Sequence, residues 1–178
     1  QVGIAAAIID AARTLPIVGI CGGYQMLGTA LSDPHQVESR DGTVSGLGLL
    51  DGQTEMGKDK ILEQAFATHL SSGLRVQGYE IHHGRTARGS VEPWLSKPDG
   101  EVVGARHPSR EIYGTYLHGV FDADEFRRWF IDSLRTRQGL SPLGRIAHVH
   151  DIEGALNRLA DIVRSAVDLD AVYCAMGL

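Results

Sequence analysis

Apolar and polar residues alternate along this chain with two periods, which predict helices and strands in turn. Residues 3–13 are rich in alanine and isoleucine and stop ahead of Pro16, so they predict a helix. Residues 16–20 form a short apolar run between Pro and Gly, which is typical of a buried parallel strand. Residues 24–31 then show the apolar spacing of a helix, with a stop at residues 32–34. The predicted order is strand, tight turn, helix.

Short strands are expected through the middle of the chain. The glycine-rich residues 42–53 predict loops around one short strand, and residues 74–81 alternate as a second strand would. A turn at residues 98–100 separates Trp94 from the next apolar run. Residues 112–117 predict a further strand, which ends at a histidine followed by glycine.

Two amphipathic helices are predicted in the last third of the chain. Asp122 and Glu125 resemble a capping pair that opens a helix, and the apolar face of this helix is Phe126, Phe130 and Leu134. The last helix has apolar residues at spacings of three and four, namely Ile152, Leu156, Leu159, Val163 and Val167.

The alternation of strands and helices predicts an α/β fold. We expect a three-layer arrangement with a mostly parallel central sheet flanked by helices, and a single domain over residues 1–178. Ligands of such sheets bind at the carboxyl ends of the strands. Cys21 and His118 both follow predicted strands, so we expect both at that edge.

Composition narrows the class of protein. The chain is 43% hydrophobic and 22% charged, with a net charge of −5 and no apolar run long enough to cross a bilayer. Acidic and basic residues are interspersed, so neither a nucleic-acid partner nor a membrane partner is predicted. Two widely separated cysteines form no disulfide framework and no metal pair, which favours a cytoplasmic protein without a metal site. Because the chain begins with Gln1 and shows no signal peptide, we expect a piece of a longer polypeptide.

Gly19-Ile20-Cys21-Gly22-Gly23 matches the G-x-nucleophile-x-G elbow, with cysteine as the nucleophile. We expect glycine two residues before and two residues after Cys21, since side chains there would collide where the strand turns into the helix. The helix start should point backbone N–H groups at Cys21, lower the thiol pKa and hold an oxyanion. The alternative is a buried cysteine in an ordinary glycine turn.

A thiol nucleophile needs a base, and His118 is the best placed of eight histidines because it ends a predicted strand. A single histidine is also often structural, so this assignment depends on both residues ending strands of one sheet. The rival bases are His82, His83 and His107. His148 and His150 lie beside the last helix and are expected on the surface, and Cys174 is expected to be an inert packing residue.

Three segments resemble class I glutamine amidotransferases of the cobyric acid synthase type. They are GICGGYQMLG at residues 19–28, GYEIHHGRT at residues 78–86 and GTYLHGVFD at residues 114–122. With the ending at residues 169–178, the resemblance covers essentially the whole chain. It implies the flavodoxin-like fold of that family, here lacking its first strand.

The resemblance also implies the chemistry of the site. Cys21 would attack the side-chain amide of glutamine, form a glutamyl thioester and release ammonia, with His118 as general base and acid. Gln25 matches a position that holds the substrate, and Gly22 would supply an oxyanion donor. Glu80 and His82 match a substrate-facing loop, although either could be structural, with a carboxylate that satisfies backbone donors.

Two departures from the family pattern alter these expectations. Many class I glutaminases place glutamate two residues after the histidine, where this chain has Val120, so the site is predicted to be a Cys-His dyad. Only 20 residues precede Cys21, so the upstream oxyanion loop of related domains is missing. Because losing one oxyanion donor costs about a hundred- to thousandfold in rate, we expect weak glutaminase activity from this chain alone.

The resemblance implies further components outside this chain. No G-x-x-x-x-G-K-[ST] motif is present, so no cofactor is expected here, and ATP with magnesium would bind a separate synthetase domain that amidates a corrinoid in cobalamin biosynthesis. Alternatives are the glutaminase of a ligase that amidates peptidoglycan precursors, a Cys-His hydrolase without ammonia transfer, and a binding domain without catalysis. A homo-oligomer is possible.

Overall fold

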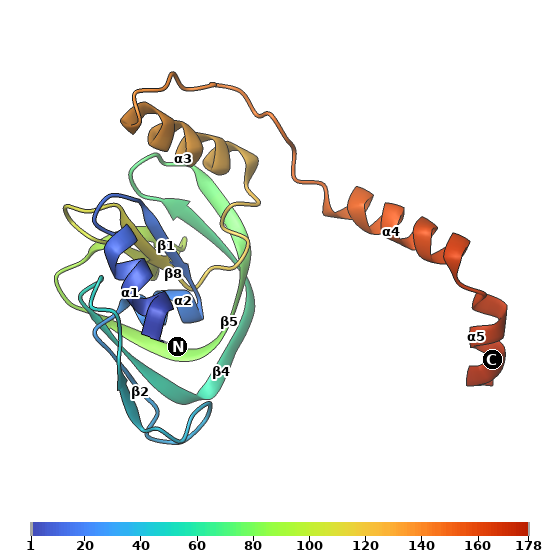
Figure 1. The fold of residues 1–178 in the computed structure, drawn as a ribbon, viewed down its shortest axis with the longest axis horizontal. Coiled ribbons are helices and arrows are strands. Elements are labelled where there is room, and N and C mark those ends of the chain that lie inside the picture. Colours follow the sequence, from blue (N-terminus) through green and yellow to red (C-terminus); the bar gives the residue numbers. More distant parts are fainter. Residues whose placement is uncertain (1, 178) are drawn as a thin grey trace. The chain divides into compact units, whose positions relative to one another are not determined.

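The computed structural model describes residues 2–177, which fall into two compact units divided after Gly144. The first unit contains one eight-stranded sheet in the order β1-β8-β7-β6-β4-β2-β3, with β5 paired to β4 (Figure 1). Its strands are β1 (Ile17–Ile20), β2 (Ala30–Ser32), β3 (Thr43–Ser45), β4 (Gly52–His69), β5 (Arg75–Arg88), β6 (Glu92–Ser96), β7 (Val102–Arg106) and β8 (Ile112–Thr115). Its helices are α1 (Val2–Ala11), α2 (Gly22–Leu27) and α3 (Asp124–Arg137).

The sheet is mixed, so the expectation of a mostly parallel sheet was wrong. Among the described strands, β1 pairs with β8 and β2 pairs with β4 in parallel, while the other pairs are antiparallel. The connections explain this arrangement, because parallel strands need a crossover of about a dozen residues whereas antiparallel strands need only a turn. The turns at Gly73 and Gly100, both with positive φ, close the β4–β5 and β6–β7 hairpins.

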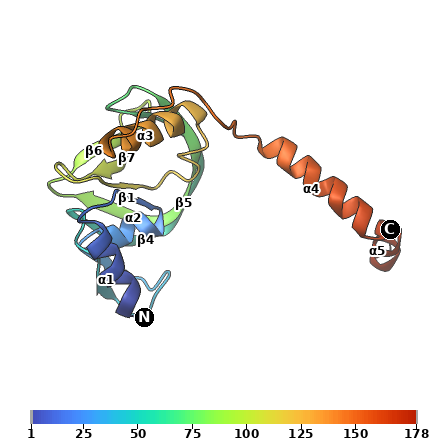
Figure 2. The same ribbon diagram turned by 45° about the horizontal axis from the view of Figure 1, so that its top comes forward.

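Helices cover both faces of the sheet around β1 and β8 (Figure 2). Ile112 of β8 packs in an apolar cluster with Tyr24 and Leu27 of α2. The next residue, Tyr113, points to the opposite face and packs with Phe126 and Phe130 of α3. The apolar faces predicted for these two helices are therefore the faces that build the core.

Three local predictions need correction. The helix after Cys21 ends at Leu27 because Gly28 is extended, with φ −66° and ψ −174°, and residues 30–32 form β2. The helix α3 begins at Asp124 with Ala123 as its N-cap and no side-chain capping hydrogen bond, so Asp122 is not its cap. The long strand β4 was missed, since polar residues 57–60 interrupt its alternation where its pairing with β5 shifts register.

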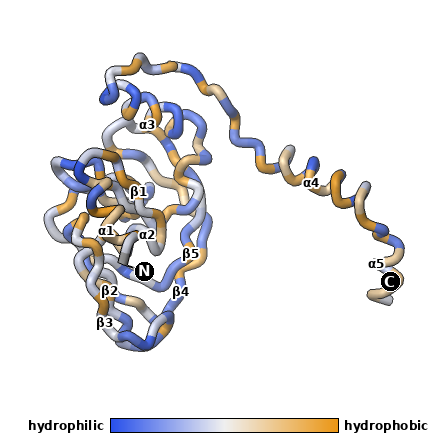
Figure 3. The backbone as a smooth tube through the Cα atoms, viewed as in Figure 1, coloured by the Kyte–Doolittle hydropathy of each residue, from blue (hydrophilic) through white to orange (hydrophobic). Residues whose placement is uncertain are grey.

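The second unit consists of two helices, α4 (Ile152–Ala166) and α5 (Leu169–Met176). Asp151 and Asp168 cap them by accepting hydrogen bonds from the Gly154 and Ala171 backbone N–H groups. Apolar residues recur along α4 between hydrophilic ones (Figure 3), so the predicted amphipathic helix is confirmed. No described helix has both the length and the apolar character needed to cross a membrane.

His69 ends β4 inside the apolar core of the first unit. It is 2% exposed, and its ring lies 4.6 Å from the ring of Trp129 and 5.1 Å from that of Phe126, measured between centroids. Its Nδ1 accepts a hydrogen bond from the Ser72 backbone N–H. Burial, with a smaller effect of Arg106, lowers the pKa of His69 to about 4, so the folded protein holds this ring neutral.

This burial predicts acid sensitivity. The stabilising effect of a neutral His69 is complete above pH 6.5 and is lost as the pH falls toward 4, at a cost of up to about 3 kcal/mol. Urea unfolding between pH 7 and pH 4 should therefore show a smaller acid-induced loss of stability for His69→Gln than for the wild type. The exposed His35→Gln serves as the control and should follow the wild type. An equally steep loss in His69→Gln would contradict the prediction.

Candidate active site

Cys21 lies at a strained elbow between β1 and α2. Its backbone has φ 53° and ψ −114°, and positive φ is rare for any residue with a side chain. Its N–H donates to the Thr115 carbonyl at 2.8 Å, which continues the β1–β8 ladder, and its carbonyl accepts from the Gln25 N–H at 3.1 Å, which starts α2. One residue thus belongs to both elements, and its side chain is left at the carboxyl edge of the sheet.

The elbow requires glycine on one side only. A Cβ at Gly19 would lie 2.6 Å from Leu27 Cδ1 and 2.7 Å from the Gly23 backbone, so the prediction for Gly19 is confirmed. At Gly23 a Cβ would meet nothing within 4 Å, so the expected collision at that position was wrong. The turn brings the backbones of Gly19 and Gly23 close together. The missing Cβ of Gly19 is enough to allow this approach.

The Cys21 thiol has a raised pKa, contrary to the expectation from the helix start. Burial raises it most; the Gly22 N–H lowers it, and the Glu38 carboxylate raises it further. The thiol donates to the Ile81 carbonyl, with Sγ 3.7 Å from the oxygen. The resting sulfur is therefore protonated and needs a base before it can act as a nucleophile.

His118 follows β8 and is held against β5 at Tyr79. The two residues exchange backbone hydrogen bonds, His118 N–H to the Tyr79 carbonyl at 2.9 Å and Tyr79 N–H to the His118 carbonyl at 3.2 Å. Their rings stack with centroids 4.8 Å apart and planes 5° apart. His118 Nε2 is buried and has no hydrogen-bond partner among the described residues. This nitrogen is available for proton transfer.

The topology places Cys21 and His118 at the same edge of the sheet. They follow adjacent parallel strands, since Ile20 of β1 is paired with Thr115 of β8. Both also contact one short segment of β5, Cys21 through the Ile81 carbonyl and His118 through Tyr79. In this structure the thiol is hydrogen-bonded to the Ile81 carbonyl and not to His118 Nε2. Catalytic hydrogen bonds are often longer before the substrate binds.

Gln25 lies one turn along α2 from the elbow, and its side chain is buried. It is 6% exposed, and a Cβ at Gly84 of β5 would lie 2.3 Å from its Nε2, so β5 passes directly over the amide. The hydroxyl of Tyr116 lies beside the same point and is 2.6 Å from Thr86 Oγ1. A cluster of hydroxyl groups and one amide therefore fixes the position of Gln25 relative to β5.

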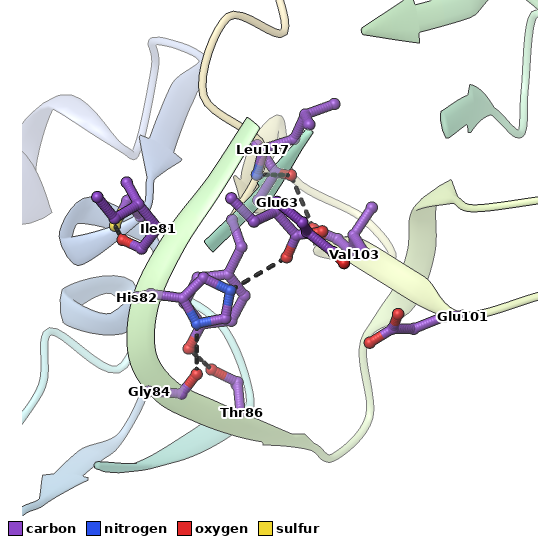
Figure 4. A network of polar contacts seen from close by, with 12 residues as sticks. Glu63, Ile81, His82, Gly84, Thr86, Glu101, Val103 and Leu117 are labelled. Carbon is purple, nitrogen blue, oxygen red and sulfur yellow. Dashed lines mark hydrogen bonds and ion pairs between the residues drawn. The ribbon is translucent and has the colours of Figure 1, made fainter. Parts of the chain in front are cut away.

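Glu80 and His82 are buried residues of β5, in a network with Lys97. Figure 4 shows the His82 ring on this strand beside Gly84. His82 donates from Nδ1 to the Gly84 carbonyl at 2.7 Å, its Nε2 is 3.1 Å from Glu80 Oε2, and its ring stacks on Tyr116 at 3.7 Å between centroids. Lys97 Nζ is 2.8 Å from Glu80 Oε1. The polar atoms of the Glu80 and His82 side chains thus contact other protein groups. Both side chains therefore support the backbone of β5 from its buried face.

The charges of this network stabilise one another. Burial alone would raise the pKa of Glu80, but hydrogen bonds from His82 and Lys97 lower it. Burial alone would lower the pKa of Lys97, but the carboxylates of Glu63, Glu80 and Glu101 raise it. Because the Lys97 side chain is 10% exposed and that of Glu80 is 3% exposed, neither charge could remain buried alone without a large cost.

A cavity of about 280 Å³ opens beside the elbow. Its lining includes Gly22, Gln25, Met26, Asp33, Glu38 and Met56. Asp33 shapes the loop on one side by accepting backbone N–H bonds from Val37, Glu38 and Ser39 at 2.8 to 2.9 Å. The cavity has room for a small amino acid, and its lining includes Gly22, the residue after Cys21, and acidic residues such as Asp33 and Glu38.

The sequence analysis missed three residues that shape the site. Tyr79 and Tyr116 contact His118 and His82 through their rings, and Glu38 acts on the Cys21 thiol through its charge. Tyr79 and Tyr116 stand inside two of the segments singled out in the sequence, next to Glu80 and two residues before His118. These positions in the sequence indicated that the two tyrosines lie near the site. The sequence does not show which histidine each ring contacts, because that depends on how β5 pairs with the residues after β8.

Comparison with known proteins gives consistent matches. Residues 1–126 match the CobB/CobQ-like glutamine amidotransferase domain. Over 91% of its length the chain is 44% identical to the adenosylcobalamin biosynthesis bifunctional protein CobDQ of Leptospira interrogans, covering 19% of that protein. It is also 44% identical, over 91% of its length, to the cobyric acid synthase of Nitratidesulfovibrio vulgaris, covering 36% of that protein. The chain therefore spans about a third or less of these two relatives.

One solved structure overlaps the chain more weakly. A Thermoplasma acidophilum protein, described as part of a GMP synthase, gives a TM-score of 0.48 at 19% identity. The overlap covers 76% of this chain and 66% of that protein.

The effect of Glu38 on the thiol can be measured directly. In a Cys174→Ser background, where only Cys21 reacts, Glu38→Gln should lower the thiol pKa because it removes a nearby negative charge. The pH dependence of alkylation by iodoacetamide reports this pKa, and a severalfold faster reaction is expected near neutral pH. Glu125→Gln, an exposed change on α3, is the control. An unchanged alkylation profile in Glu38→Gln would rule out the electrostatic effect.

The buried network predicts strong coupling between Lys97 and Glu80. Lys97→Met should destabilise the protein by about 3 kcal/mol because it leaves a buried carboxylate without its cation. Adding Glu80→Gln should recover part of this loss, so that the double variant is more stable than the sum of the single effects. Urea unfolding measures all three variants, with the exposed Lys60→Met as control. Strictly additive effects would argue against the coupling.

Proposed function

The chain belongs to the family of CobB/CobQ-like glutamine amidotransferase domains, and we propose that it releases ammonia from glutamine to amidate carboxylates of a corrinoid. The observation that carries the proposal is the meeting of Cys21 and His118 on one segment of β5, at the ends of adjacent parallel strands. A nucleophile and a base at one edge, beside a cavity of suitable size, are what amide hydrolysis through a thioester needs.

The reaction begins with transfer of the Cys21 proton to His118. The thiolate then adds to the side-chain amide carbon of glutamine, and the Gly22 N–H, which already interacts with the sulfur, faces the oxygen that becomes negative. His118 returns the proton to the amide nitrogen, the C–N bond breaks, and ammonia leaves a glutamyl thioester on Cys21. Water then hydrolyses the thioester to glutamate, with His118 again as the base.

Substrate glutamine is proposed to occupy the cavity beside the elbow. Gln25 and Gly22 are among the residues that line it. Glu80 and His82 remain candidate residues of the substrate loop. Because their polar atoms are bonded to Lys97, to Gly84 and to each other, we propose that they act by holding the β5 backbone in place.

The acceptor is inferred from the relatives. One is named cobyric acid synthase and another acts in adenosylcobalamin biosynthesis, and both are much longer than this chain. We propose that a cytoplasmic ATP- and magnesium-dependent synthetase part activates the corrinoid carboxylate, and that ammonia from Cys21 completes the amide.

Covalent labelling tests the nucleophile. A chloroketone or diazoketone analogue of glutamine should modify Cys21, and excess glutamine should protect it. Cys21→Ser should abolish labelling, His118→Ala should slow it near neutral pH by about a hundredfold or more, and Cys174→Ser should change neither. Peptide mapping by mass spectrometry locates the adduct. Modification of Cys174 instead, or labelling that glutamine does not prevent, would contradict the proposed mechanism.

A second experiment tests the acceptor. A polypeptide that joins this chain to the synthetase part of the Nitratidesulfovibrio vulgaris relative should amidate a corrinoid with glutamine or with ammonium as the nitrogen source. Cys21→Ser in this polypeptide should lose only the glutamine-dependent reaction. Mass spectrometry of the corrinoid measures both. Amidation with ammonium but not with glutamine in the unchanged polypeptide would show that the chain does not supply the nitrogen.

A further inference from the structure

The catalytic imidazole has no carboxylate at the position that orients it in many glutaminases of this class. The residue two positions after His118 is Val120. Val120 is fully buried and packs with Leu117 and Phe126 in the apolar core. No group at that position can accept a hydrogen bond from His118, yet a base must keep a fixed plane to exchange protons with sulfur.

Tyr79 restrains both the backbone and the ring of His118. Two backbone hydrogen bonds fix the Cα of His118 relative to Tyr79, and the nearly parallel stack fixes the plane of its ring. Stacking contacts the faces of the imidazole, whereas both nitrogens lie on its edge. The contact therefore sets the plane of the ring without occupying Nε2, which has no hydrogen-bond partner among the described residues.

The neighbouring glycine shows how closely the two segments approach. A Cβ at Gly78 would lie 1.7 Å from the His118 carbonyl oxygen, so only glycine lets β5 come near enough for the stack. Gly119, with φ 76°, turns the chain away directly after His118. The backbone on both sides of His118 thus brings the two segments close enough for the rings to stack.

We propose that Tyr79 is a positioning residue for His118: its ring fixes the plane of the imidazole through stacking, in the role that a carboxylate has in a Cys-His-Glu triad. The inference rests on the proposed function, because it assigns His118 as the base. Its consequence is specific. Without the Tyr79 ring, the His118 imidazole is still present but less firmly held, so it should transfer protons less efficiently. Binding of glutamine in the cavity beside α2 should be largely unchanged.

The test uses labelling of Cys21 by the glutamine analogue in the Cys174→Ser background. Tyr79→Ala and Tyr79→Leu should lower the maximal labelling rate near neutral pH by roughly ten- to hundredfold, with little change in the analogue concentration at half-saturation. The deficit should shrink at alkaline pH, where the thiol ionises without a base. Tyr79→Phe retains the ring and should restore most of the rate. Gln77→Ala, an exposed change on the same face of β5, is the matched control.

Two further variants separate the possible outcomes. Asp122→Asn tests a carboxylate close to the residue after His118, since its Oδ2 would be 2.9 Å from a Cβ at Gly119. Wild-type rates in Tyr79→Ala, a deficit that stays equal at alkaline pH, or a pH profile altered only by Asp122→Asn would each overturn the role of Tyr79. If His118→Ala labels as fast as the wild type near neutral pH, the proposed function itself fails. Because Tyr79 is 48% exposed, its substitution should leave the fold intact, and thermal melting checks this.

Discussion

The backbone pairing of Tyr79 with His118 is the contact on which the site depends. It attaches β5, a strand whose ladder partner is β4, to the end of β8 at the far side of the sheet order. From that attachment, Ile81 comes to face the Cys21 thiol and Gly84 comes to cover Gln25. Gly78 makes the pairing possible because any side chain there would overlap the His118 carbonyl. A few backbone contacts thus assemble groups from three separate segments.

The buried charged residues next to β5 also help to hold this strand in position. The strand β5 pairs with β4 along nearly its whole length, but the register of this ladder is broken between Met56 and Ile61. On the buried side of β5, Glu80 pairs with Lys97, the residue after β6, and the His82 ring stacks on Tyr116. Ion pairs of this kind add little net stability but penalise any other geometry, since each charge would lose its partner. The network is therefore better understood as fixing one position of β5 than as a source of stability.

Electrostatics also explain why Cys21, as the proposed nucleophile, would need a base, for which we propose His118. A short helix with one N–H directed at the sulfur does not offset the burial of the thiol and the charge of Glu38. The neutral thiol is unreactive until a base removes its proton, which limits its reaction with electrophiles other than a bound substrate. Glu38, whose charge adds to the effect of burial on the thiol pKa, also lines the cavity in which we propose that glutamine binds.

The sequence by itself determined the local features of this protein. Glycine spacing placed Cys21 on an elbow, apolar periodicity gave α3 and α4, and the resemblance of three segments gave the family, because each of these signals lies within a few neighbouring residues. Only the tertiary structure decided the rest. The mixed sheet, the long strand β4 across a polar stretch, the raised pKa of Cys21 and the stacking of Tyr79 on His118 all depend on residues distant in sequence. Pairing, burial and charge are set by which segments meet in space, and a linear pattern does not contain that information.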